Sequence, residues 1–195
     1  MTKISFGMMV SLDGYIAGPE GGPSLPPPNE ELHQYWNDVQ KRTDVLLYGR
    51  RMYEVMRYWD SADTNPESLP VEVDFALAWQ RTPKVVFSTT LTDVGPNARL
   101  VKENVREAVE GLKTNPGGNI EVAGAGLAAT LSRLGLIDEY RLYACPVVLG
   151  GGKPFFEAGT SLTLVPLATE KLPQGVVLMR YRGVSAISGE AQIDT

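Results

Sequence analysis

The sequence is poor in the residues that form covalent cross-links and transition-metal sites. Its 195 residues include one cysteine, Cys145, and one histidine, His33. A single cysteine excludes an internal disulfide bond, and a reducing cytoplasm is the simplest location for such a chain. One thiol and one imidazole also supply too few ligands for a zinc site, so we expect no bound metal.

Long apolar runs and an excess of basic residues are missing as well. No apolar run approaches the ~20 residues of a membrane span, and the apolar residues 4–10 are too short for a signal peptide. The chain carries 18 Lys and Arg against 23 Asp and Glu, a net charge of −5, without a dense basic run. This composition argues against nucleic acid or a membrane as the partner and favours a globular protein that binds a small molecule.

Strand-like and helix-like segments alternate along the chain. Short apolar runs typical of buried strands occupy residues 4–10, 45–48, 84–87 and 120–123. Helix-period apolar patterns lie between and after them, at residues 30–39, 50–59, 71–80, 103–113 and 127–134. The alternation predicts an α/β fold around a mostly parallel sheet.

The C-terminal part has a different pattern. We predict a long strand over residues 139–149, ended by three consecutive glycines. Residues 162–171 and 175–183 then predict an antiparallel hairpin. Because no second domain boundary is visible, we expect one domain over residues 1–184 and a loose tail over residues 185–195.

Residues 119–135 are the most informative stretch. A β-branched run leads into Gly124-Ala125-Gly126, and a helix-period pattern begins at Leu127. A strand, a glycine turn and a helix start are the parts that hold a phosphate. Glycine lets the backbone approach the anion, and the first N–H groups of the helix point at it. The alternative is a purely structural turn.

Two further predicted strands end in small or polar residues. These are Gly49-Arg50-Arg51 and Ser88-Thr89-Thr90. In open α/β sheets, ligands bind beyond the carboxyl ends of the strands, so the three segments together predict a nucleotide site. Guanidinium and hydroxyl groups suit a 2′-phosphate, which favours NADP over NAD. Alternatively, the arginines are solvated helix charges and the hydroxyl residues a plain turn.

Four motifs occur in the order found in one known superfamily, and the resemblance that they carry covers residues 3 to about 183. They are residues 11–17 (SLDGYIA), 49–54 (GRRMYE), 122–126 (VAGAG) and 146–156 (PVVLGGGKPFF). The chain resembles the dihydrofolate reductase-like superfamily, most closely the branch with the C-terminal reductase domain of bacterial riboflavin biosynthesis. The resemblance implies a three-layer α/β sandwich and an NADPH-dependent reductase of a small pterin-, folate- or ribosylaminopyrimidine-like heterocycle. It also implies a homodimer paired through the C-terminal strands.

The resemblance also assigns roles to individual residues. Those expected beside the nicotinamide are Val10, Ile16 and Ala17. Those expected at the phosphates and the adenosine ribose are Gly49, Arg50, Arg51 and Met52. The 2′-phosphate would contact Ser88 and Thr89, and the pyrophosphate would lie on Gly124, Ala125, Gly126 and Leu127. A non-catalytic NADP- or small-ligand-binding protein of the same fold is the alternative.

Reduction of a C=N or C=O bond also needs a proton donor. Asp13 follows the first strand, in the motif expected at the nicotinamide. Glu30 and Glu31 open the helix that follows the proline-rich loop 18–29, with Asn29 as its cap. We favour Glu31 and keep Asp13 as the second candidate catalytic residue. The alternatives are a turn role for Asp13 and compensation of the helix dipole for the glutamates.

The sequence also allows predictions for four further side chains. We expect His33 to be a surface or boundary residue and Cys145 a small buried core residue. Phe155 and Phe156 follow the flexible triglycine. They either lie exposed, which would favour a dimer contact, or fold back onto the core.

Overall fold

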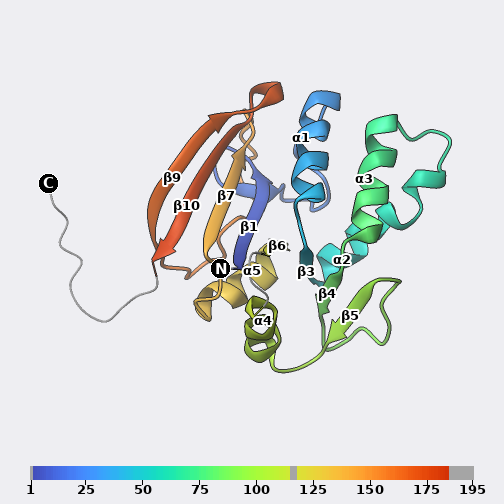
Figure 1. Ribbon diagram of the computed structural model, residues 1–195. Helices are drawn as coiled ribbons and strands as arrows, with labels where there is room; N and C mark the ends of the chain where they lie inside the picture. Colours follow the sequence, from blue (N-terminus) through green and yellow to red (C-terminus); the bar gives the residue numbers. More distant parts are fainter. Residues whose placement is uncertain (1, 115–117, 185–195) are drawn as a thin grey trace, which may run out of the picture.

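The computed structural model describes residues 2–114 and 118–184, and the predicted tail lies outside these ranges. An eight-stranded sheet forms the centre of the molecule (Figure 1). In spatial order its strands are β5 (Ala98–Val101), β4 (Lys84–Phe87), β3 (Val45–Gly49), β6 (Asn119–Ala123), β1 (Lys3–Val10), β7 (Glu139–Ala144), β10 (Val177–Val184) and β9 (Thr163–Lys171). A separate two-stranded ribbon pairs β2 (Tyr15–Ala17) with β8 (Lys153–Pro154).

The first six strands in this spatial order run parallel, and β10 is antiparallel to both β7 and β9. The predicted α/β class, mostly parallel sheet and C-terminal hairpin are therefore confirmed. The helices are α1 (Glu30–Lys41), α2 (Arg50–Met56), α3 (Pro70–Arg81), α4 (Val105–Lys113) and α5 (Ala125–Arg133). Short 3₁₀ turns are η1 (Arg57–Asp60), η2 (Ala62–Thr64) and η3 (Pro173–Gly175). Among the described residues, no helix has the length and apolar character to cross a membrane.

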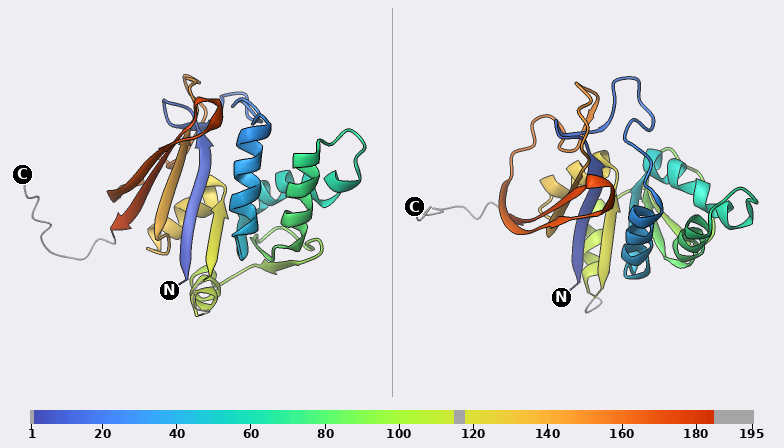
Figure 2. Two further views of the ribbon diagram at one scale, coloured as in Figure 1. Left: turned by 45° about the horizontal axis from the view of Figure 1, so that its top comes forward. Right: turned by 90° about the horizontal axis from the view of Figure 1, so that it is seen from above.

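Helices cover both faces of the sheet, because successive residues of each strand point to opposite sides. From β1, Ile4 and Phe6 pack with Leu131 of α5 on one face. On the other face, Met9 packs with Leu32 of α1. The right-hand view of Figure 2 shows β1 between these two helices.

Two predicted boundaries are wrong. Strand β7 ends at Ala144 rather than at residue 149, because Pro146 has no N–H and the N–H groups of Leu149 and Gly150 bond to a carboxylate instead of a strand. Helix α2 ends at Met56, and the chain continues as the 3₁₀ turn η1.

The expectation for His33 is wrong as well. His33 is only 8% exposed, and its Nδ1 lies 3.2 Å from Oδ1 of Asn37. Its ring packs edge-on against Trp59 and Phe75. The reason is that α3 packs across α1, a tertiary contact that the local pattern around His33 does not reveal.

Cys145 is 1% exposed, as expected of a core residue. Phe155 is 2% exposed, and its ring centroid lies 4.5 Å from that of Phe6. Phe156 packs against Phe155 and Tyr140. Of the two alternatives for these phenylalanines, the fold back onto the core is therefore the correct one, and they give no independent support for a dimer.

A buried carboxylate joins three strands of the sheet. The side chain of Glu139 in β7 is fully buried and forms ion pairs with Lys3 of β1, Arg141 of β7 and Arg180 of β10. The Nε atoms of the two arginines lie 2.7 Å and 2.8 Å from its Oε1. Three cations around one carboxylate offset the cost of removing that charge from water.

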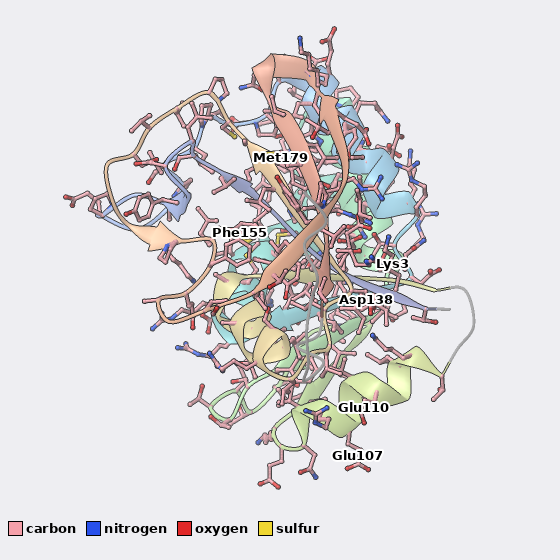
Figure 3. All side chains as sticks on the ribbon, turned by 90° about the vertical axis from the view of Figure 1, so that its left-hand side faces the viewer. Lys3, Glu107, Glu110, Asp138, Phe155 and Met179 are labelled. Atoms are coloured by element: carbon pink, nitrogen blue, oxygen red, sulfur yellow. The ribbon has the colours of Figure 1, made fainter. Side chains whose placement is uncertain are left out.

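We expect Glu139→Gln to lower the free energy of unfolding by about 3–5 kcal/mol at neutral pH, because three cationic side chains would surround a neutral amide. Urea unfolding measures the change. The control is Glu110→Gln on α4 (Figure 3), which breaks an exposed ion pair with Arg106 and should cost at most about 0.5 kcal/mol.

The difference in unfolding free energy between wild type and Glu139→Gln should also depend on pH. Burial by itself would raise the pKa of Glu139, but hydrogen bonds from its three cationic partners lower it to about 2. Because this folded-state pKa lies below that of the unfolded chain, the stabilisation is complete above about pH 4.5 and is lost as the pH falls towards 2. Wild type and Glu139→Gln should therefore converge in stability over that range, and a constant difference would contradict this account.

Candidate functional site

The strand register aligns the carboxyl ends of three neighbouring strands. In the β3–β4 pair Gly49 lies opposite Phe87, and in the β3–β6 pair Tyr48 lies opposite Ala123. The residues that come next, Arg50, Ser88 and Gly124, therefore leave the sheet at one edge. The three segments singled out in the sequence are brought together at this edge.

Two helices start side by side there. A Cβ added to Gly124 would lie 3.0 Å from Cβ of Met52 in α2, and Gly124 has a φ of +97°. A Cβ added to Gly49 would lie 3.6 Å from Cβ of Leu127 in α5. Glycine at 124 thus serves both the left-handed backbone and the close packing of α2 against α5.

The starts of α2 and α5 differ from the start of α1. Helix α1 has Asn29 as its cap, with Oδ1 accepting the N–H of Leu32 at 2.9 Å, and two glutamates in its first turn. Neither α2 nor α5 has a side-chain cap or an acidic residue in its first turn. The first N–H groups of α5 therefore face an edge where no acidic side chain of the helix competes for them.

Four side chains are predicted to contact the 2′-phosphate or the adenosine ribose, and they differ in their contacts within the protein. Arg50 pairs with Glu54 at 3.1 Å, and Oγ of Ser88 accepts the N–H groups of Thr90 and Leu91. The side chains of Arg51 and Thr89 are exposed and form no hydrogen bond or ion pair within the described ranges. Arg51 and Thr89 are thus free to meet an anion, whereas Arg50 has an exposed, exchangeable partner.

The segment predicted to lie at the nicotinamide is tied to the loop between β7 and β8. Leu12 donates its N–H to the carbonyl of Val147 at 2.8 Å, and Phe155 donates to the carbonyl of Gly14 at 2.9 Å. The pairing of β2 with β8 extends this contact to Tyr15 and Ala17, the residues on either side of Ile16. The two segments therefore form one unit, at the carboxyl end of β1.

Gly152 makes the closest backbone approach in this unit. A Cβ at this position would lie 2.1 Å from the carbonyl oxygen of Ala17 and 2.6 Å from the carbonyl carbon of Gly18. Its φ is +120°, in the region that favours glycine. Of the three consecutive glycines, Gly152 is therefore the one that must be glycine, because the chain crosses β2 there.

Asp13 holds the same loop from the other side. Its Oδ1 accepts the N–H of Leu149 at 3.0 Å, and its Oδ2 accepts that of Gly150 at 2.7 Å. A hydrogen bond with the Ser11 side chain, followed by those from the loop, lowers the pKa of Asp13. Asp13 is therefore an ionised carboxylate that anchors the loop, and neither of the roles considered from the sequence includes this contact.

The two glutamates at the start of α1 are both exposed. Asn29 in front of them donates its N–H to Oε1 of Gln174 at 2.8 Å, and Gln174 also donates to the carbonyl of Pro27. The turn between β9 and β10 thus holds the proline-rich loop. Within the described ranges, Glu31 forms no hydrogen bond or ion pair that would link it to Asp13 or to the β2–β8 unit.

Comparison with known proteins identifies the family. The family model of the RibD C-terminal domain matches residues 2–178, and the chain therefore belongs to this family. A similar relative is the uncharacterised protein YyaP of Bacillus subtilis (strain 168), 32% identical over 183 residues that cover 92% of this chain and 94% of YyaP.

Solved structures show the same fold. A Shewanella sp. PV-4 protein, assigned provisionally to riboflavin biosynthesis, matches with a TM-score of 0.72 and 24% identity, over 94% of this chain and 99% of that one. Dihydrofolate reductase from Enterococcus faecalis, complexed with NADP(H), matches with a TM-score of 0.59 and 15% identity, over 94% and 97% of the two chains. The expected dihydrofolate reductase-like fold is confirmed, and the chain has a reductase-type fold.

We expect Gly152→Ala to displace the β7–β8 loop, because the new methyl group would overlap the carbonyl of Ala17. Hydrogen exchange of the Leu149 and Gly150 amides, which bond to Asp13, should become faster. The matched control is Gly150→Ala, where φ is +73° but no atom lies within 4 Å of the new Cβ. That change should add only about 1–2 kcal/mol of backbone strain and leave the loop in place. Equal exchange rates of these amides in the two variants would contradict the close approach of Gly152 to Ala17.

Proposed function

We propose that this protein is an NADPH-dependent reductase of a small heterocyclic substrate. The observation that carries the proposal is the meeting of α2 and α5 at Gly49 and Gly124, without a capping side chain or an acidic residue in either first turn. Membership of the RibD C-terminal domain family and the fold shared with an NADP(H)-bound dihydrofolate reductase support it.

The adenosine side of the cofactor would lie over α2, α5 and the end of β4. The N–H groups of Ala125, Gly126 and Leu127 would hold the pyrophosphate at the start of α5. Gly49 and Met52 would line the ribose from α2. Arg51 and Thr89 would contact the 2′-phosphate directly. Arg50 would join them by exchanging Glu54 for the phosphate, and Ser88 would shape the turn that presents Thr89.

The nicotinamide side would lie against Val10, Ile16 and Ala17. NADPH, when bound, supplies the hydride that reduces the substrate. The chain's own contribution at this end is orientation. The Asp13 carboxylate and the Gly152 crossing hold the β2–β8 unit in one position, so Ile16 and Ala17 would present a fixed surface to the ring.

Glu31 is our choice for the proton donor. Asp13 already accepts two loop N–H groups and has a lowered pKa, so giving a proton to substrate would break the anchor that it forms. Glu31 is exposed in the first turn of α1, whose Leu32 packs beside Met9 of β1. A heterocycle bound near the end of β1 would thus lie within reach of this helix start.

Three further proposals rest on resemblance and composition. A ribosylaminopyrimidine-, pterin- or folate-like compound is the substrate class, and a homodimer paired through the C-terminal strands is the assembly. The single cysteine favours the cytoplasm as the location.

We predict that NADPH binds more tightly than NADH, because Arg50, Arg51 and Thr89 are available for the 2′-phosphate. Changing both arginines to alanine should narrow the preference, with each lost charge-assisted contact costing roughly 1.5–3 kcal/mol. Fluorescence titration measures the affinities, with Arg106→Ala on α4 as the matched control. Equal affinities of wild type for the two cofactors would refute this assignment.

We predict that Glu31→Gln slows hydride transfer in single turnover by roughly 10²–10⁴, the range for general acid catalysis, without weakening NADPH binding. Dihydrofolate and a ribosylaminopyrimidine are the substrates to test. Glu30→Gln is the neighbouring control and should transfer hydride at the wild-type rate. Unchanged rates in Asp13→Asn, Glu30→Gln and Glu31→Gln would mean that water or the substrate supplies the proton. NADPH binding without oxidation of the cofactor by either substrate would favour the non-catalytic alternative.

A further inference from the structure

The turn that joins β9 to β10 has an unusual residue at its first central position. Gln174 and Gly175 both have positive φ angles, +60° and +72°, and the N–H of Val176 bonds to the carbonyl of Pro173 at 3.3 Å. These features match a type I′ hairpin turn, whose first central position favours Asn, Asp or Gly. A glutamine in the left-handed region raises the free energy of the folded chain, because its Cβ crowds the backbone. The turn itself therefore does not explain Gln174.

The side-chain contacts of Gln174 do explain it. Its Oε1 accepts the N–H of Asn29 at 2.8 Å, and its Nε2 donates to the carbonyl of Pro27 at 3.0 Å, across 145 and 147 positions of the chain. Asparagine suits the turn better but is shorter by one C–C bond, about 1.5 Å. With asparagine, both contacts would exceed hydrogen-bond length. The two ends of one glutamine amide thus hold the end of the proline-rich loop.

The same segments also pack together through apolar side chains. One cluster joins the loop, α1, the β9–β10 turn and β1 through Leu25, Leu32, Leu172, Val176 and Met9. Apolar packing is non-directional, whereas hydrogen bonds have narrow ranges of length and angle. Packing therefore brings the turn, the loop and the helix together, and Gln174 fixes their relative position.

The segments that Gln174 holds border the proposed reaction site. The loop 18–29 begins directly after Ala17, which is predicted to lie at the nicotinamide, and ends at Asn29, the cap of α1. Glu31, the proposed proton donor, follows this cap by two residues. Figure 1 shows the β9–β10 turn beside one end of α1, and the two are in contact. Gln174 therefore acts on the helix start that carries Glu31.

We propose that Gln174 is a positioning residue of the reductase site. It holds the start of α1, and with it Glu31, at a fixed place relative to the end of β1. This inference rests on the proposed function, because it assigns a part in the same reaction to a residue of the C-terminal hairpin. Hydride transfer needs the substrate, the cofactor and the proton donor in near-attack geometry, and a displacement of about 1 Å can slow a reaction by about 100-fold.

Position and stability can be separated at this residue. Gln174, Pro27 and Asn29 are all exposed, so water satisfies the two backbone groups when the glutamine amide is lost. A residue that suits the left-handed region would also relieve the backbone strain of the turn. The right substitution should therefore release the start of α1 without destabilising the fold.

Gln174→Asn is this substitution, because Asn-Gly is a preferred pair for a type I′ turn. We expect its thermal unfolding temperature to equal or exceed that of wild type. Hydrogen exchange of the Asn29 amide should be about 2- to 10-fold faster, since this N–H loses its acceptor. Single-turnover hydride transfer from NADPH to dihydrofolate or a ribosylaminopyrimidine should be at least about 10-fold slower, with unchanged NADPH affinity.

Gln34→Asn on α1 is the matched control. Gln34 is exposed and donates to Asp38 of the same helix at 3.1 Å, so this change should leave the Asn29 exchange and the hydride-transfer rate at their wild-type values. Gln174→Glu tests rescue. It keeps the side-chain length and the acceptor for Asn29 but loses the donor to Pro27, so its rate should lie between those of wild type and Gln174→Asn.

Three results would overturn the proposal. They are a wild-type rate in Gln174→Asn, unchanged exchange of its Asn29 amide, and a slower rate accompanied by a lower unfolding temperature, which would indicate a role in stability alone. Wild type that reduces neither substrate would refute the proposed reductase function instead. In that case the Asn29 exchange still decides whether Gln174 fixes the start of α1: faster exchange in Gln174→Asn supports this, and unchanged exchange overturns it.

Discussion

The direction of the parallel strands is the constraint on which the rest of this structure depends. Six strands run the same way, so all of their carboxyl ends lie at one edge and all of their amino ends at the other. Register then decides which residues meet. Gly49 opposite Phe87 and Tyr48 opposite Ala123 align three loops that lie far apart in the sequence. A one-residue slip would turn every side chain of a strand to the other face and separate them.

The sequence was sufficient for the elements whose signals are local. Asn29 before Glu30 and Glu31 marks the start of α1, and the structure shows that cap. The strand, glycine turn and helix at residues 119–135 appear as β6, Gly124 and α5. In each case the deciding interaction lies within a few residues of the signal, which is why pattern and propensity were sufficient.

Three of the errors involve partners distant in the chain. Asp13 looked like a turn residue or an acid, but its hydrogen-bond partners are 136 and 137 positions away. The same contact shortened β7, because it withdraws two N–H groups from strand pairing. His33 is buried by α3, which begins 37 residues later at Pro70. The candidate catalytic residues stay predictions for the same reason, since the geometry around a substrate depends on contacts that local patterns do not encode.

The charged residues at the amino end of the sheet raise a separate question about stability. Well-packed apolar residues in place of a buried ion pair are often neutral or stabilising, so stability alone does not explain Glu139 with its three cations. Arg141 and Arg180 lie opposite each other in the strand register, and the Glu139 carboxylate that both contact helps to offset their repulsion. Glu121 pairs with Arg141 and Glu170 with Arg180, so Glu121, Glu139 and Glu170 balance the charges of Lys3, Arg141 and Arg180. The face is therefore an ion-pair network in which each charge has an opposite partner, and the loss of one member would leave another charge unpaired.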